Sequence, residues 1–108
     1  MNSIVPLNSV TQWQLGQLIF NTSTRQLRLN NKQVYLEPKQ YQILLSLLRT
    51  AVETLSRDQL IQTVWRGRIV SDGAINRAIS MLRKAFASLD PDTNYIETLP
   101  KLGYRLAP

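Results

Sequence analysis

Apolar and polar residues alternate with a period of two in the first third of the chain, which is typical of short β-strands. Residues 13–20 form the first alternating stretch, and Gly16 within it marks a turn or a bulge. Two further alternating stretches, 27–29 and 34–36, follow polar turn clusters. These connections are too short for parallel crossovers, so we expect an antiparallel meander of three strands.

The period changes at Pro38, where apolar residues begin to recur at helical spacing. Proline is accepted in the first turn of a helix because its missing N–H is not needed there, so a helix is expected from about residue 38 to about residue 50. Ser56 is a good N-cap for a second helix, since its hydroxyl can accept a hydrogen bond from a free first-turn N–H. Gly67 is expected to end this second helix.

A third helix is expected to begin at Ser71 or Asp72 and to run to about Ala87. Its apolar residues recur at steps of four, three and four, which places them on one face of the helix. This apolar stripe consists of Ile75, Ile79, Leu82 and Phe86. Because a short loop joins the second and third helices, the two form a candidate helix-turn-helix.

The C-terminal segment has the pattern of a β-hairpin, with strands at residues 95–99 and 104–106 and a turn at residues 100–103. We therefore predict an α+β winged helix-turn-helix fold: an N-terminal antiparallel β-sheet, three helices and a C-terminal β-hairpin wing. Residues 1–12 show no clear period and are interpreted as an N-terminal lead-in, with the winged-helix domain at residues 13–108.

The composition limits the chemistry that the chain can perform. Its 108 residues include no cysteine and no histidine, which excludes disulfides, thiolate metal sites and the usual general base at neutral pH. The seven carboxylates are scattered without an acid–base pair, and no glycine-rich phosphate loop is present. We therefore expect no enzyme, no catalytic residue, no cofactor and no metal. No stretch reaches about 18 consecutive apolar residues, so no membrane span is expected within the sequence.

Basic residues outnumber acidic residues by thirteen to seven, and the net charge of +6 favours an anionic partner such as nucleic acid or, less often, a membrane surface. Most of the excess lies between residues 66 and 84, where five basic residues accompany a single acidic residue, Asp72. Any one of these cations could simply be solvated. Their concentration behind a helix-turn-helix pattern and before a hairpin favours contact with DNA.

The outward face of the third helix supplies the first candidate contacts, because successive residues of a helix are turned by about 100°. Small or polar side chains there would let the helix approach the major groove, where arginine can bind guanine and asparagine can pair with adenine. Lysine and arginine can also neutralise phosphate. The candidates are Arg77, Ser80 and Lys84 opposite the apolar stripe, Met81 beside them, and Asn76 and Arg83 on the flank.

The C-terminal hairpin supplies the second set. Thr98, Lys101 and Arg105 lie on or beside its turn, where they could reach a DNA backbone or the minor groove. Gly103 indicates either unusual backbone angles or close packing against a neighbour. The alternative interpretation is that the hairpin only closes the core.

Several separated motifs resemble those of OmpR/PhoB-type winged-helix domains, and the match covers about residues 13–107. The motifs are Leu-Glu-Pro-Lys-Gln-Tyr-Gln-Ile-Leu at 36–44 for the first helix, Val-Ser-Asp at 70–72 with Leu-Arg-Lys-Ala-Phe at 82–86 for the recognition helix, and Tyr-Ile-Glu-Thr at 95–98 with Gly-Tyr-Arg-Leu at 103–106 for the wing. Ile-Glu-Thr, Pro-Lys and Gly-Tyr-Arg at the wing are similar in particular to the CadC/ToxR-like membrane-anchored transcriptional regulators.

The resemblance implies sequence-specific binding of double-stranded DNA by a bacterial transcriptional regulator, with the wing against the backbone or the minor groove. It assigns readout of the major groove to Asn76, Arg77, Ser80, Met81 and Lys84. It also matches one loop to a segment that in some relatives touches RNA polymerase or a neighbouring subunit; this loop consists of Arg66, Gly67, Arg68, Ile69 and Val70.

In the CadC/ToxR-like subgroup a transmembrane helix and a periplasmic sensor follow this domain. The resemblance therefore implies a cytoplasmic domain that is anchored to the membrane only through a segment missing from this chain. It is also consistent with a dimer on repeated half-sites. Two positions depart from the family pattern: Met81 stands where many response regulators carry a cation, and Leu102 where the subgroup often carries arginine. Both weaken the transfer of specific base contacts.

A second class of function stays open, namely a winged-helix module used mainly for protein contact with RNA polymerase or a co-regulator. The exposed position expected for Leu102 and the basic loop allow it, whereas the charge of residues 66–84 argues against it as the main role. RNA binding is less favoured, because the aromatic residues that could stack on bases are interpreted as core. These residues are Trp13, Trp65 and Tyr104.

Overall fold

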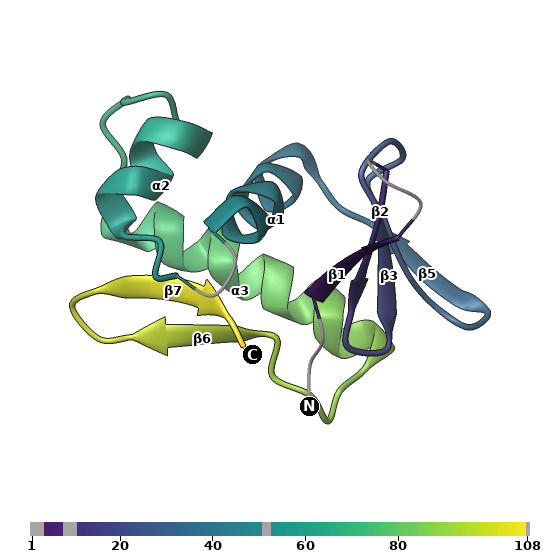
Figure 1. Cartoon of the computed structure of the whole chain (residues 1–108). Coiled ribbons are helices and arrows are strands. Elements are labelled where there is room, and N and C mark those ends of the chain that lie inside the picture. The colour runs from purple at the N-terminus through teal and green to yellow at the C-terminus, as the bar shows by residue number, and fades with distance from the viewer. Residues whose placement is uncertain (1–3, 8–10, 51–52, 108) are drawn as a thin grey trace.

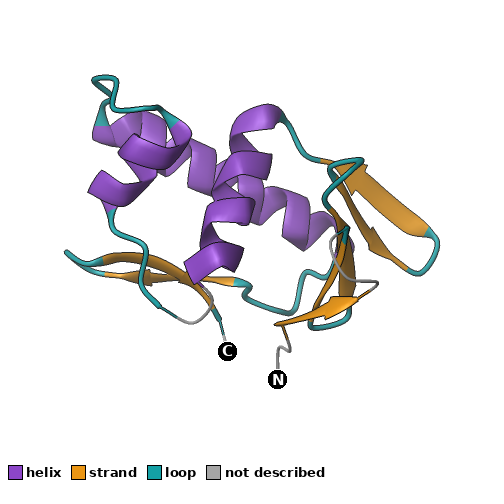
Figure 2. Cartoon of the chain, turned by 45° about the horizontal axis from the view of Figure 1, so that its top comes forward, coloured by secondary structure: helices purple, strands orange, loops and turns teal. Residues whose placement is uncertain are grey.

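The computed structural model describes residues 4–7, 11–50 and 53–107 (Figure 1). The elements in these ranges are β1 (Ile4–Leu7), β2 (Gln12–Leu15), β3 (Leu18–Asn21), β4 (Gln26–Leu29), β5 (Lys32–Tyr35), α1 (Pro38–Thr50), α2 (Arg57–Val64), α3 (Asp72–Leu89), β6 (Ile96–Leu99) and β7 (Gly103–Leu106). Helix α3 runs along the molecule, with the N-terminal sheet at one end and α2 and the β6–β7 hairpin at the other. Figure 2 shows the helices grouped together, with the hairpin below them and the N-terminal sheet to the right. The predicted α+β winged-helix order is confirmed.

The N-terminal sheet is antiparallel and has five strands in the described residues, in the order β1-β2-β3-β4-β5. Only three strands were expected. The stretch 13–20 is divided into β2 and β3 by a two-residue turn in which Gly16 has a φ of 59°. In addition, β1 pairs with β2, with Ile4 opposite Leu15. The interpretation of residues 1–12 as a lead-in therefore does not hold for residues 4–7, whereas residues 1–3 and 8–10 lie outside the described part.

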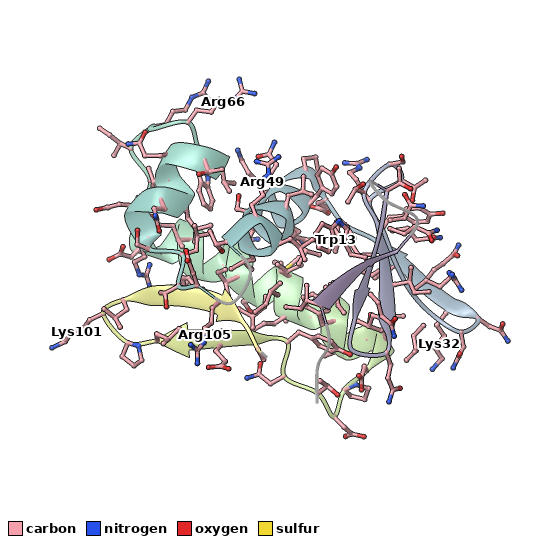
Figure 3. The ribbon with its side chains drawn as sticks, viewed as in Figure 1. Trp13, Lys32, Arg49, Arg66, Lys101 and Arg105 are labelled. Atoms are coloured by element: carbon pink, nitrogen blue, oxygen red, sulfur yellow. The ribbon has the colours of Figure 1, made fainter. Side chains whose placement is uncertain are left out.

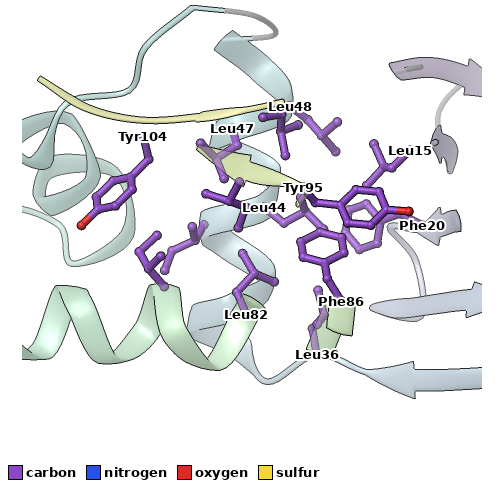
Figure 4. Close-up of a cluster of buried hydrophobic side chains, with 14 of the residues drawn as sticks. Leu15, Phe20, Leu36, Leu44, Leu47, Leu48, Leu82, Phe86, Tyr95 and Tyr104 are labelled. Atoms are coloured by element: carbon purple, nitrogen blue, oxygen red, sulfur yellow. The ribbon is translucent and has the colours of Figure 1, made fainter. Parts of the chain in front are cut away.

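One core joins the sheet to the helices. Figure 4 shows side chains from α1, α3 and the sheet in one cluster, with Phe20 towards the sheet and Tyr104 towards the hairpin. The rings of Phe20 and Tyr41 of α1 pack edge to face with their centroids 5.9 Å apart, and the Tyr41 hydroxyl donates to the carbonyl of Thr22 at 2.7 Å. Each fully buried apolar side chain of this kind contributes about 1.5–3 kcal/mol to folding.

Local capping defines the helix-turn-helix. Ser56 accepts from the N–H of Gln59, whose side chain accepts from the Ser56 N–H in return, so the predicted N-cap is confirmed as a capping box. Helix α2 ends at Val64 rather than at Gly67, although the Gly67 N–H still donates to the carbonyl of Ile61 at 2.9 Å. This bond ties the turn to the last helical residues.

Ser71 rather than Asp72 caps α3, since its hydroxyl accepts from the N–H of Ala74. The helix continues to Leu89, two residues beyond the predicted end, because Leu89 extends the buried face. The whole apolar stripe predicted for this helix is buried: Ile75, Ile79, Leu82 and Phe86.

The hairpin is joined to the segment before α2. Leu55 and Tyr104 exchange two backbone hydrogen bonds of 2.7 and 2.9 Å, which form an isolated antiparallel β-bridge beside β7. Gly103 begins β7 with a φ of 144°, and a Cβ atom there would overlap the Leu55 carbonyl and come within 2.8 Å of Ser56 Cα. Gly103 therefore has both the unusual backbone and the close neighbour expected from the sequence.

Candidate nucleic-acid interface

The outer face of α3, which we define as Arg77, Ser80, Met81 and Lys84, is exposed along its length. Burial of the stripe headed by Ile75 fixes the rotation of the helix, and these positions consequently point to solvent. Within the described residues, Arg77 and Lys84 make no hydrogen bond or ion pair, so both charges are available to a partner. Met81 is 39% exposed at the edge of this face and adds an apolar contact surface.

The flank of α3 that faces the hairpin is organised differently. The Nη2 atom of Arg83 donates to the Ile96 carbonyl at 2.9 Å and to the Thr98 hydroxyl at 2.8 Å. Arg83 and Thr98 were both predicted to contact DNA, yet their side chains bind each other. In the structure these two residues hold strand β6 against α3. Any contact with DNA would have to use the N–H groups of Arg83 that do not take part in these bonds.

Asn76 lies on the same flank, one turn from the start of α3, and its side chain is also engaged. Its Oδ1 atom accepts from Arg57 Nη2 at 2.8 Å and from the Tyr104 hydroxyl at 3.3 Å. The same guanidinium lies 5.7 Å from the centre of the Tyr104 ring and 3.5 Å from an Asp72 carboxylate oxygen. Arg57 thereby connects α2, the first turns of α3 and strand β7.

The predicted wing residues do not share one face. Thr98 lies on the side of the hairpin that faces α3, where it binds Arg83, whereas Arg105 pairs with Glu97 in the register and lies on the other side (Figure 3). There Arg105 donates from Nε and Nη2 to the Glu97 carboxylate at 3.3 and 3.1 Å, and both side chains are about one-third exposed. Lys101 is exposed at the tip with a φ of 65°. Lys101 is therefore the wing cation with the freest charge, while the charge of Arg105 is paired.

The predicted partner loop at residues 66–70 projects from the end of α2. Arg66 and Gly67 have φ values of 55° and 77°, which turns the chain sharply after the helix. Arg66, Arg68 and Ile69 are exposed, Ile69 completely, whereas Val70 packs partly against the core. The loop consequently presents two cations and one bare apolar side chain, with Arg66 at the rim of the molecule (Figure 3).

Two residues near this surface were not singled out from the sequence. Lys39 donates to the Val64 carbonyl at the end of α2 at 3.1 Å, and its ammonium lies 5.6 Å from the centre of the Trp65 ring. Arg57 contacts Asn76 across 19 positions of the chain. Neither contact follows from local spacing, because both depend on how the helices pack.

Tyr95 supports the interface from behind. Its ring stacks on Phe86 of α3 at 4.7 Å, and its hydroxyl donates to Asp90 at 2.6 Å. Burial, followed by this hydrogen bond and the negative charge of Asp90, raises the pKa of Tyr95 above its ordinary value. The neutral phenol therefore fixes the point where the chain leaves α3 and enters β6.

Within the described ranges, no three acidic side chains gather into a group that could hold a metal ion. None of the helices in the same ranges combines the length and apolar character needed to span a bilayer. The geometry offers two cations without a partner among the described residues, Arg77 and Lys84, on an exposed helix beside an anchored hairpin, which suits an anionic partner with a groove.

Comparison with known proteins agrees with this geometry. The family model described as transcriptional regulatory protein, C terminal, matches residues 31–106. The chain belongs to this family. It is a family of transcriptional regulators rather than of enzymes, in agreement with the exclusion made from the sequence.

The relatives place the chain among OmpR/PhoB-type domains of the CadC and ToxR-like kind. It is 37% identical over 94 residues to the transcriptional activator CadC of Escherichia coli, which covers 86% of this chain and 18% of CadC. It is also 37% identical over 101 residues to the transcriptional regulator HilA of Salmonella typhimurium, covering 94% of this chain and 18% of HilA. The chain thus spans less than a fifth of the length of these curated relatives.

Two solved structures confirm the winged-helix fold. The DNA-binding domain of E. coli CadC superposes with a TM-score of 0.76 at 37% identity, covering 84% of this chain and 86% of the other. The DNA-binding domain of RstA from Klebsiella pneumoniae, solved in complex with the RstA box, gives a TM-score of 0.73 at 28% identity, covering 91% and 98%.

Proposed function

We propose that this domain binds double-stranded DNA in a sequence-specific way as part of a transcriptional regulator. Helix α3 enters the major groove and the β6–β7 hairpin lies beside it as the wing. The observation that carries the proposal is the exposed outer face of α3, on which Arg77 and Lys84 have no partner among the described residues. The likeness to the RstA domain, solved in complex with the RstA box, supports the same mode of binding.

In this mode the two kinds of contact have different roles. Lysine and arginine contacts with phosphate supply most of the affinity and make it fall steeply with salt. Arg77, in the N-terminal half of α3, supplies sequence preference by donating to a base edge. Lys84 and Lys101 are assigned to the backbone, because each lies towards one end of the proposed contact surface.

The test is selection from a random duplex library at two salt concentrations with the wild-type domain, Arg77→Ala and Arg49→Ala. Arg49 is exposed in the last turn of α1, on a different helix from the outer face of α3, so its variant removes the same charge elsewhere. We expect an enriched motif that Arg77→Ala blurs at one position, at a cost of about 1–3 kcal/mol on the selected site. Arg49→Ala should leave the motif intact. Equal losses for both variants on selected and random DNA would refute base readout by Arg77.

The finer biological setting follows from the resemblance to CadC/ToxR-like regulators. We propose that the domain acts in the cytoplasm and is anchored through a segment outside this sequence. A single small domain of this kind binds weakly, so pairing on repeated half-sites would raise affinity through effective concentration. Sedimentation of the domain with one and with two half-sites would show whether the second copy binds more tightly.

Ile69 favours a second function, contact between the loop at residues 66–70 and RNA polymerase or a co-regulator. Ile69 is fully exposed between Arg68 and the start of α3, and its burial by a protein partner would be favourable because it removes apolar surface from water. Ile69→Ser should leave DNA affinity unchanged and lower transcription from a bound promoter. A matched fall in DNA affinity would instead assign the loop to DNA.

A further inference from the structure

We propose that Asn76 reads DNA as a hydrogen-bond donor only, because Arg57 and Tyr104 already occupy its carbonyl oxygen. This inference rests on the proposed function, and it names the base edge that one position of α3 recognises. Asparagine in a recognition helix ordinarily pairs with adenine through both amide atoms, accepting from N6 and donating to N7. The side chain of Asn76 is not free to do both.

The orientation of the amide follows from the chemistry of its neighbours. An arginine guanidinium carries only donors, so the Asn76 atom that lies 2.8 Å from Arg57 Nη2 must be the oxygen. The Tyr104 hydroxyl donates to the same oxygen at 3.3 Å. An amide oxygen has two lone pairs, and these two donors use both. The Nδ2 atom of Asn76, with two N–H donors, is what remains for a partner.

Three separate elements hold this arrangement in place. Arg57 is the first residue of α2, fixed by the adjacent capping box of Ser56. Tyr104 is buried in β7, and its main chain is paired with Leu55 on both sides of the bridge. The guanidinium also lies near the Tyr104 ring and 3.5 Å from Asp72 at the start of α3. Turning the Asn76 amide over would place its N–H groups against the Arg57 guanidinium, which can only donate, and this repulsion opposes reorientation.

A donor-only side chain selects among bases in a predictable way. In the major groove, guanine offers O6 and N7, thymine offers O4 and adenine offers N7 as acceptors, whereas cytosine presents its N4 donor. Asn76 should therefore exclude cytosine and show little preference between adenine and guanine. The position that it contacts would be degenerate for a reason that the sequence alone does not reveal, since asparagine by itself suggests adenine.

Selection with the wild-type domain and with Asn76→Ala first identifies the base position whose preference depends on Asn76. The experiment then compares binding to four duplexes that differ only at this position. For the wild-type domain we expect adenine and guanine to bind within about threefold of each other, and cytosine about tenfold more weakly. Asn76→Asp keeps two acceptors for Arg57 and Tyr104 but has no N–H to offer. This variant should reverse the order and favour cytosine.

A second arm frees the oxygen instead. Tyr104→Phe keeps the buried ring and removes one donor, and Arg57→Met keeps the length of the stem and removes the other. The double variant, checked for native circular dichroism, should gain a preference for adenine of about fivefold or more. If it does not fold, the Asn76→Asp arm decides the question, because that substitution preserves the internal hydrogen bonds.

Three results would overturn the inference. The first is a wild-type preference for adenine over guanine of about tenfold that Asn76→Asp abolishes, since both amide atoms would then be in use. The second is the absence of any base position that responds to replacement of Asn76, which would remove it from the groove. In both cases wild-type DNA binding persists, so the proposed function stands. The third, a wild-type domain that selects no site, would remove the proposed function itself.

Discussion

The outer face of α3 and its hairpin-facing flank carry the same kinds of side chain but use them differently. Arg77 and Arg83 are six positions apart on one helix. Arg77 is exposed and has no partner among the described residues, whereas Arg83 is half-buried and donates to Ile96 and Thr98 of the wing. The charged groups of the outer face are therefore available to a partner. Those of the flank are largely used in hydrogen bonds that hold the recognition helix and the wing together.

This difference shows that a polar residue outside the apolar stripe can either remain exposed to solvent or form hydrogen bonds with another element. Helical periodicity separates buried from outward positions, but both arginines count as outward by that criterion. What distinguishes them is a second element that passes close to one flank and supplies acceptors. The affinity of the outer face depends on the flank, since a helix and a wing that move independently would lose part of their shared fit to DNA.

The largest effect is expected where the wing meets the rest of the domain. Gly103→Ala adds a Cβ that overlaps the Leu55 carbonyl, on a residue with a φ of 144°. Backbone strain and overpacking each cost about 1–3 kcal/mol, so the free energy of unfolding should fall by several kcal/mol. Urea unfolding measures this change. Gly73→Ala is the matched control, because its Cβ would meet only Ser71 Oγ at 3.8 Å and should stabilise the exposed helix slightly.

A smaller effect on stability should separate the two arginines. Arg83→Met removes both hydrogen bonds to the wing and leaves the Ile96 carbonyl without this donor, at a cost of about 1–3 kcal/mol in the free energy of unfolding. Arg77→Met should change stability by less than about 0.5 kcal/mol, because an exposed side chain without partners contributes little to folding.

The same pair of variants should behave differently on DNA. Arg77→Met is expected to weaken the selected site and relax its sequence, whereas Arg83→Met should weaken all sequences alike by loosening the wing. A loss of stability for Arg77→Met as large as that for Arg83→Met would end the distinction between the face and the flank.

Much of this division could not be read from the sequence, for identifiable reasons. The apolar stripe from Ile75 to Phe86 and the N-cap at Ser56 were predicted correctly, because both depend on residues within one or two helical turns. Strand β1 was missed, since four residues around Pro6 carry no recognisable period. Arg57 lies 19 positions from Asn76, and Thr98 lies 15 positions from Arg83, so only packing of the helices and the hairpin brings these partners together. The predicted DNA contacts themselves stay predictions.

The smallest effect expected is a pH dependence of the free energy of unfolding, which arises from Tyr95 at the junction between α3 and β6. Because the pKa of Tyr95 is raised in the folded protein, the fold binds this proton more tightly than the unfolded chain does. The resulting stability is present below about pH 10, the ordinary tyrosine value, and is lost as the pH rises above it. Tyr95→Phe should cost about 0.5–1.5 kcal/mol at neutral pH through loss of the bond to Asp90. Unfolding curves from pH 8 to pH 11 should then converge for the two proteins, since the variant has no phenol to ionise at this site. Curves that stay parallel throughout would show that the phenol does not anchor the junction between α3 and β6.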